Sequence, residues 1–195
     1  MLLWRERLLD VPIMSLQTGT QLGVIKESII NPKDLSIIAF YCEGPLIQEK
    51  PAVLHTADIR EFGELGMIID DSDMIMPLEG LVRLQQILDY NFELIDKRVI
   101  DTTKSKLGKI TNYIIETNSF EIVKLGVRRP FLKALNDAEL LIDRDQIRKI
   151  TDTEIIVEAP TVKEKTPVLR ETLRPAQEFR NPFRGAQPEH IDNQK

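Results

Sequence analysis

Apolar and polar side chains alternate along two segments of this chain, and the two segments share one pattern. Residues 107–125 are predicted to form a strand, a polar turn and a second strand, because their apolar positions recur with the period of two typical of a half-buried strand. Residues 22–40 have the same arrangement 85 positions earlier. Each segment is therefore predicted to be a β-hairpin, with its turn at Asn31–Asp34 or Thr117–Ser119.

The likeness between the two predicted hairpins extends to identical residues. When residues 20–45 are aligned without a gap on residues 105–130, seven of the 26 positions are identical, whereas average composition gives roughly one or two by chance. The identical pairs are Leu22/Leu107, Gly23/Gly108, Ile25/Ile110, Ile29/Ile114, Ile30/Ile115, Ile37/Ile122 and Pro45/Pro130. An offset of 85 residues is too long for a solenoid repeat. The sequence therefore predicts two tandem copies of one small domain.

The first strand of each hairpin alternates less cleanly than the second. Ile25 and Ile29 share a face, yet Glu27 lies between them, and the second copy has Asn112 at the equivalent position. We expect a β-bulge or a strongly curved strand here, as small barrels require. The second strand alternates clearly, and Cys42 falls on its apolar face, which favours a buried, unreactive thiol.

Shorter apolar runs complete each copy, and the turns between them have the spacing of a small antiparallel barrel. Both copies carry an Ile-Arg pair, which we place in one-turn segments at 57–62 and 145–150. These pairs are 88 residues apart, so a small insertion is expected around 132–139. Between the copies, residues 77–90 have near-helical apolar spacing with proline in the first turn, which predicts a helix packed on one or both barrels.

The predicted fold class is mainly β: two tandem small antiparallel β-barrels joined by a helix and followed by a disordered C-terminal tail. The tail has four prolines, scattered charge and few aliphatic residues, so it buries too little apolar surface to offset its ordering entropy. The predicted parts are the first repeat (1–76), the connecting helix (77–90), the second repeat (91–160) and the tail (161–195).

Composition is that of an ordinary globular protein, with 42% hydrophobic and 29% charged residues in 195. The net charge of −5 is uneven: residues 1–80 carry −7, residues 81–160 carry 0 and residues 161–195 carry +2. An acidic first copy argues against nucleic acid wrapped along the whole molecule, because phosphate binding needs a positive face.

The single cysteine, Cys42, excludes an intrachain disulfide and fits a reducing compartment. The N-terminal segment lacks the apolar core of a signal peptide, and no window approaches the run of about 20 apolar residues that spans a bilayer. We therefore expect a cytoplasmic protein without a membrane span.

The repeated segment resembles the PRC-barrel family, which is named for the photosynthetic reaction centre H subunit and supplies the C-terminal barrel of the ribosome maturation factor RimM. The resemblance is carried by residues 21–25 and 106–110, the Ile-Ile pair and polar turn after each, and the alternating strand that follows. It covers roughly residues 10–158, as two copies. It implies small barrels that act as adaptor modules for other proteins. The chain departs from both known settings of the family, because we expect neither a membrane span like that of the H subunit nor a companion domain of the RimM type, only a second barrel.

Basic side chains gather in the second copy and are the candidate contacts for a protein partner or RNA. They are Lys104, Lys106, Lys109, Arg128 and Arg129. They are expected near one end of the barrel, where they can meet an acidic protein or RNA. No aromatic residue is interleaved for base stacking, and an ordinary solvated face is the alternative.

The tail offers a candidate docking motif with two aromatic residues in a basic setting: Phe179, Pro182 and Phe183. Chance occurrence is the alternative. The two histidines, His55 and His190, have no clustered partner, which favours loop residues over metal ligands or acid–base groups.

The acidic run Asp70–Asp73 lacks the glycine and distal glutamate of a calcium loop, so a solvated turn is favoured. No nucleotide, nucleophile or metal motif is present in the sequence. We therefore expect no enzyme activity, no catalytic or metal site and no cofactor.

The favoured function is a non-catalytic cytoplasmic adaptor that binds another protein through its PRC-like barrels. The alternative is a ribosome-maturation or RNA-processing assembly factor of the RimM type, with a ribosomal protein or rRNA as partner. Assembly of the chain into a homo-oligomer is a further open alternative.

Overall fold

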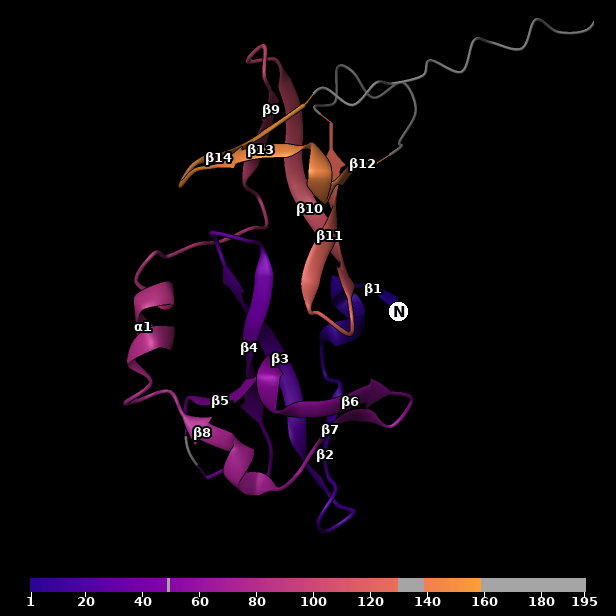
Figure 1. The fold of residues 1–195 in the computed structure, drawn as a ribbon, viewed down its shortest axis with the longest axis vertical. Helices are drawn as coiled ribbons and strands as arrows, with labels where there is room; N and C mark the ends of the chain where they lie inside the picture. The colour runs from indigo at the N-terminus through magenta and orange to yellow at the C-terminus, as the bar shows by residue number, and fades with distance from the viewer. Residues whose placement is uncertain (49, 130–138, 159–195) are drawn as a thin grey trace, which may run out of the picture. The chain divides into compact units, whose positions relative to one another are not determined.

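The computed structural model describes residues 1–48, 50–129 and 139–158. The described residues belong to one compact unit, and residues 161–195 lie outside them. The described part is mainly β, with α1 as its one α-helix (Figure 1). The predicted tail and most of the predicted insertion at 132–139 also lie outside these residues.

The first half of the described chain is a sheet with two long antiparallel strands at its centre and shorter strands paired on either side. Its strands are β2 (Pro12–Ser15), β3 (Gln21–Asn31), β4 (Ser36–Glu43), β5 (Ala52–His55), β6 (Ile59–Gly63), β7 (Gly66–Ile69) and β8 (Ile75–Pro77). They are hydrogen-bonded in the order β6-β7-β2-β3-β4-β5-β8. The β2–β7 pair is parallel, and all the other pairs are antiparallel.

The second half repeats this order of pairing. Its strands are β9 (Arg98–Asp101), β10 (Lys106–Glu116), β11 (Glu121–Arg128), β12 (Leu140–Asp143), β13 (Ile147–Ile150) and β14 (Glu154–Val157). They pair in the order β13-β14-β9-β10-β11-β12, and β9–β14 is again the parallel pair. An offset of 85 relates β3 and β4 to β10 and β11, and an offset of 88 relates β5, β6 and β7 to β12, β13 and β14. Residues related by these offsets are called counterparts below.

Irregularities in the long hairpins also fall at counterpart positions. The β3–β4 register shifts between Ile25 and Glu27, and the β10–β11 register shifts between Ile110 and Asn112. A second shift follows each of them, at 29–30 and at 114–115. The bulge predicted from the broken alternation is therefore confirmed. Such bulges bend a strand and increase its twist, which lets each long hairpin curl around its core.

The interior of both halves belongs to one hydrophobic cluster. Ile25 and its counterpart Ile110 are fully buried in it, and so are Phe40 and its counterpart Leu125. These are the side chains that the alternating pattern places on the inner faces. Burial of such apolar surface is the dominant favourable term in folding, so both halves depend on the same positions for stability.

The two halves are joined at the hairpin tips, where β4 pairs with β11 through Ser36 and Glu121 (Figure 1). A further strand, β1 (Leu2–Trp4), pairs with β10 of the second half, although the predicted division places it in the first repeat. The result is one 14-stranded sheet that does not close on itself. The structure therefore does not confirm the two tandem barrels predicted from the sequence.

Helix α1 is shorter than predicted, at Val82–Leu88 in place of 77–90. Its Leu84 is buried with Ile29, Ala39 and Val53, so it packs on the first half. The other helices among the described residues are single 3-10 turns: η1 (Arg5–Leu8), η2 (Thr56–Asp58), η3 (Ser72–Met74) and η5 (Arg144–Gln146).

The Ile-Arg pairs do not lie in one-turn segments, which corrects the prediction. Ile59 and Arg60 begin β6, and Ile147 and Arg148 begin β13; the 3-10 turns precede them. In each half a 3-10 turn is followed directly by a short strand that begins with the Ile-Arg pair. Such a strand is too short for alternation of apolar and polar residues to distinguish it from the turn.

Candidate functional site

Four of the five basic residues predicted as partner contacts line one groove of about 410 Å³ on the second half. They are Lys106, Lys109, Arg128 and Arg129. The groove lies over β9, β10, the end of β11 and the start of β14. Lys104 is not among the lining residues; it lies in the turn between β9 and β10. We call this site the basic groove.

Strand register places three cations of the basic groove side by side. Lys109 on β10 is opposite Arg128 on β11 and also opposite Arg98 on β9. All three side chains are exposed. Within the described ranges, none of them forms an ion pair with a carboxylate. Like charges on directly opposed residues destabilise a sheet, so we expect this row to lower the stability of the free protein.

Acidic and apolar groups complete the lining of the basic groove. Glu154 pairs in register with Arg98 at one end of the row, and Asp96 also lines the groove. Ile100 is half-buried and gives the groove apolar surface between the charges, whereas Val99 is fully buried beneath it. The five cations, Arg98 included, therefore outnumber the two carboxylates, and the groove favours an anionic ligand with some apolar surface.

The fold itself does not require these cations. In the first half, Val24 is opposite Glu43 and Pro12, in the same register that Lys109 has with Arg128 and Arg98. An apolar and acidic set thus supports the same strand pairing. Sequence reasoning missed Arg98 because only the β9–β10 register brings it beside Lys109. A comparison of the two copies at β2 and β9 is the signal that could have found it.

The acidic run at 70–73 is used structurally. Asp70 accepts two hydrogen bonds from Arg60, at 2.8 and 2.6 Å, and these bonds lower the pKa of Asp70. Asp71 accepts from the backbone N–H of Asp73 and so caps η3. In the described residues, no group of three or more His, Cys, Asp or Glu side chains is arranged to hold a metal ion.

The remaining candidate residues are placed as follows. His55 is half-buried at the end of β5, whereas His190 and the tail motif of Phe179, Pro182 and Phe183 lie outside the described residues. Cys42 is buried, and burial raises the pKa of its thiol to about 12. The thiol therefore stays protonated at neutral pH, in agreement with the unreactive cysteine predicted from the sequence.

No described helix has both the length and the apolar character required to cross a membrane.

Comparison with known proteins locates one recognised domain in the chain. The PRC-barrel domain model matches residues 88–163, so a PRC-barrel domain is present there. This range contains the whole basic groove. No curated protein matches the sequence. The specific likeness to the reaction centre H subunit and to the RimM barrel stays a prediction.

Proposed function

We propose that the PRC-barrel domain at residues 88–163 makes this chain a non-catalytic adaptor, and that its basic groove binds an acidic segment of another protein. The PRC barrel is a fold that can mediate protein interactions. We place the adaptor in the cytoplasm as part of the same proposal, which the protonated, buried thiol of Cys42 suits.

The row of Arg98, Lys109 and Arg128 is the observation that supports this proposal most directly. Three cations in register repel one another, and none of them forms an ion pair within the described part of the chain. The counterpart residues indicate that the sheet forms without them. A row that costs stability and is not needed for pairing is best explained by a ligand. Carboxylates bound between these strands remove the repulsion and form charge-assisted hydrogen bonds with the two guanidinium groups.

A protein segment suits the groove better than a polyanion does. Ile100 offers apolar contact, and Asp96 and Glu154 repel an unbroken line of negative charge. A segment with aliphatic side chains among acidic ones matches both features. Electrostatic complementarity of this kind sets specificity and association rate more than it sets affinity.

We also propose that the first half is a second copy of the same domain. The order of pairing, the positions of the bulges and the buried counterparts support a duplication. The two copies then have different roles. The second copy has the binding groove, whereas the first is acidic, packs against α1 and stabilises the second. Tandem barrels, the proposed domain boundaries and self-association belong to this proposal.

The alternative function is an assembly factor for ribosome maturation or RNA processing, with rRNA or a ribosomal protein as partner. The same cations could neutralise phosphates, which supports it. Aromatic side chains do not line the described basic groove, however, so bases have no stacking surface there. We therefore favour a protein partner.

The test uses the full chain and two probes of equal charge in fluorescence anisotropy. One probe is a labelled peptide of alternating glutamate and leucine, and the other is a labelled single-stranded uridine oligonucleotide. We expect the peptide to bind more tightly, and Lys109→Glu with Arg128→Glu to weaken it by at least about tenfold. Arg83→Glu, an exposed change on α1, is the matched control and leaves binding unchanged. Tighter binding of the oligonucleotide establishes the alternative, and equal binding by the double variant overturns the proposal.

A further inference from the structure

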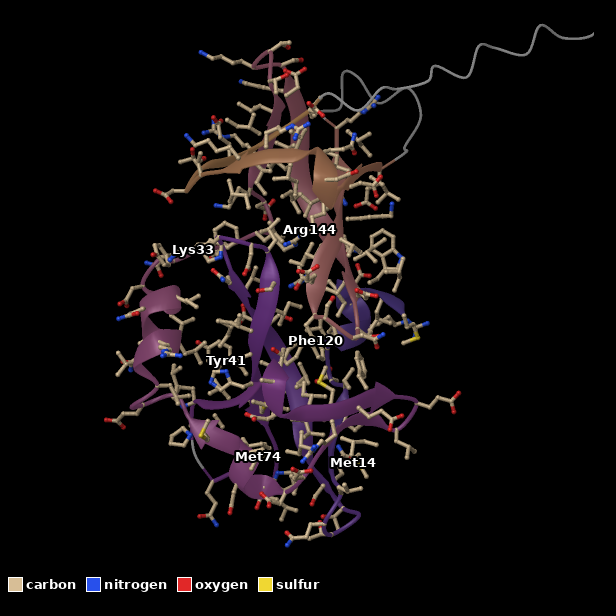
Figure 2. The ribbon with its side chains drawn as sticks, viewed as in Figure 1. Met14, Lys33, Tyr41, Met74, Phe120 and Arg144 are labelled. Atoms are coloured by element: carbon tan, nitrogen blue, oxygen red, sulfur yellow. The ribbon has the colours of Figure 1, made fainter. Side chains whose placement is uncertain are left out.

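A second cleft, distinct from the basic groove, lies where the tip of the first hairpin meets β13. Its volume is about 430 Å³. It is lined by residues 32–35, by Tyr90 and Phe92 after α1, by Arg144, and by residues 147–152. We call it the tip cleft. Lys33 and Arg144, which both line it, are labelled in Figure 2.

The counterpart positions at the other hairpin tip are occupied by aromatic rings. Phe120 stacks on Phe62 of β6, with ring centroids 6.5 Å apart and an interplanar angle of 9°. In the tip cleft, the counterparts of these two residues are Leu35 and Ile150. Two smaller aliphatic side chains therefore stand where the duplicated arrangement holds a pair of rings. Leu35 is buried, so the apolar surface that the tip cleft offers to an aromatic ring comes from the half-buried Ile150 and Phe92 and from the exposed Tyr90.

The charge at the rim of the tip cleft also differs from that of its counterpart. Lys149 replaces Glu61, and Lys33 replaces Asn118. Both lysines are exposed. The Lys33 ammonium lies 5.7 Å from the centre of the Tyr90 ring, so it stays close to the aromatic wall of the cleft.

The two arginines of the tip cleft are already engaged within the chain. Arg144 donates to the backbone carbonyls of Asp34, Leu35 and Ile122, with the bond to Ile122 at 3.0 Å and that to Leu35 at 3.4 Å. Arg148 pairs with Glu158 at 2.5 Å. Lys33 and Lys149 are thus the cations left for a ligand, since neither forms an ion pair with the part of the chain described here.

Asp34 and Asp152 line the same cleft and limit the negative charge that it accepts. The Asp34 carboxylate accepts from the backbone and hydroxyl of Ser36, at 3.0 and 2.7 Å, while Asp152 is exposed. Two ammonium groups beside two carboxylates suit one or two acidic side chains. A polyphosphate or a nucleic acid strand carries more charge than this rim can neutralise.

We propose that the tip cleft binds one aromatic side chain from an acidic segment of a partner protein. The ring rests on Ile150 beside Tyr90 and Phe92, and flanking carboxylates meet Lys33 and Lys149. Buried aromatic anchors of this kind carry much of the energy of protein interfaces. This inference depends on the proposed function in one respect, namely that the ligand is another protein. The tip cleft shares no residue with the basic groove.

The chain's own tail has the wrong charge for this site. Its aromatic residues Phe179 and Phe183 are followed by Arg180 and Arg184, which Lys33 and Lys149 repel. Substitution of both phenylalanines by alanine in the full chain is therefore expected to leave the affinity for a labelled acidic peptide with one tryptophan unchanged. A clear gain in affinity shows that the tail occupies the cleft, and that result overturns the assignment to a partner.

The main test measures two labelled peptides by fluorescence anisotropy, with Lys109→Glu and Arg128→Glu present to silence the basic groove. One peptide has a tryptophan between pairs of glutamates, and the other has alanine in its place. We expect the tryptophan peptide to bind at least about tenfold more tightly, because only its ring fills the cleft. Equal binding of the two peptides overturns the proposal.

Two variants then locate the site. Ile150→Phe restores the counterpart of Phe62 and fills the cleft, so the preference for tryptophan should disappear. Lys149→Glu, which introduces the counterpart of Glu61, leaves the cleft open and should weaken binding about three- to tenfold. Circular dichroism melts establish that each variant is folded. An unchanged preference for tryptophan in a folded Ile150→Phe variant contradicts the assignment. If that variant unfolds, unchanged affinity of Lys149→Glu for the tryptophan peptide contradicts it instead.

Discussion

Leu35 and Phe120 are counterparts in the two hairpin tips, and each accepts a backbone hydrogen bond from the other half. The Ile122 N–H donates to the Leu35 carbonyl at 3.0 Å, and the Ile37 N–H donates to the Phe120 carbonyl at 2.8 Å. Both residues have left-handed backbones, with φ of 52° and 53°. Such values are uncommon for bulky residues, so the reciprocal bonds and the burial of both side chains offset a local strain. The two halves are thus hydrogen-bonded to each other at the turns of the two hairpins.

The Phe120 ring, labelled in Figure 2, should contribute strongly to this coupling, because it is buried and contacts the rings of Phe40 and Phe62. We expect Phe120→Ala to lower the free energy of unfolding by about 3–5 kcal/mol. Phe120→Leu, which introduces the residue found at the counterpart position, should cost about 1–3 kcal/mol through loss of the ring pairs. Chemical denaturation monitored by circular dichroism measures both. A loss below about 1 kcal/mol for Phe120→Ala would show that the tip contacts do not hold the halves together.

Arg144 links the two hairpin tips, because it donates hydrogen bonds to the carbonyls of Asp34 and Leu35 in the first half and of Ile122 in the second. Its counterpart Thr56 donates only within its own half, to the carbonyls of Ile37 and Ile38. Arg144→Ala should therefore lower the free energy of unfolding by about 1–2 kcal/mol, since the guanidinium is partly exposed. Arg144→Lys should recover little of this, because an ammonium cannot reproduce the fork of donors. Full stability of the lysine variant in urea unfolding would mean that only its charge matters.

The cation row of the basic groove should cost the free protein stability. We expect Lys109→Val, which introduces the counterpart of Val24, to raise the free energy of unfolding by about 0.2–1 kcal/mol. The gain should shrink as salt is added, because salt screens exposed like charges. Urea unfolding at low and high salt measures it. Lys106→Val is the matched control, since Lys106 is opposite Ile100 and its removal should give no salt-dependent gain.

The Cys42 thiol should be inert in the folded protein. Burial raises its pKa from 9.0 to about 12, and the thiolate is the reactive form. Folding favours the protonated thiol, so its contribution to stability is complete below pH 9.0 and is lost as pH rises toward about 12. Iodoacetamide at pH 8 should alkylate the unfolded chain but not the native one. Cys42→Val should lack this alkaline loss, and rapid alkylation without unfolding would contradict the buried assignment.

Hydrophobic alternation alone determined the two hairpins, their bulges and their shared inner positions, because a strand with one buried face must place apolar groups at every second residue. The resemblance of the repeated motif to the PRC-barrel family indicated the domain type, and the cluster of basic residues in the second copy included four of the five cations that line the basic groove. Only the tertiary structure decided that the sheet stays open, that β1 pairs with the second half, and that Arg98 completes the cation row. These outcomes depend on which strands become neighbours across long separations in the chain. The tip cleft is likewise a result of the tertiary structure, because it lies where Leu35 and Ile150, the counterparts of the stacked Phe120 and Phe62, come close together.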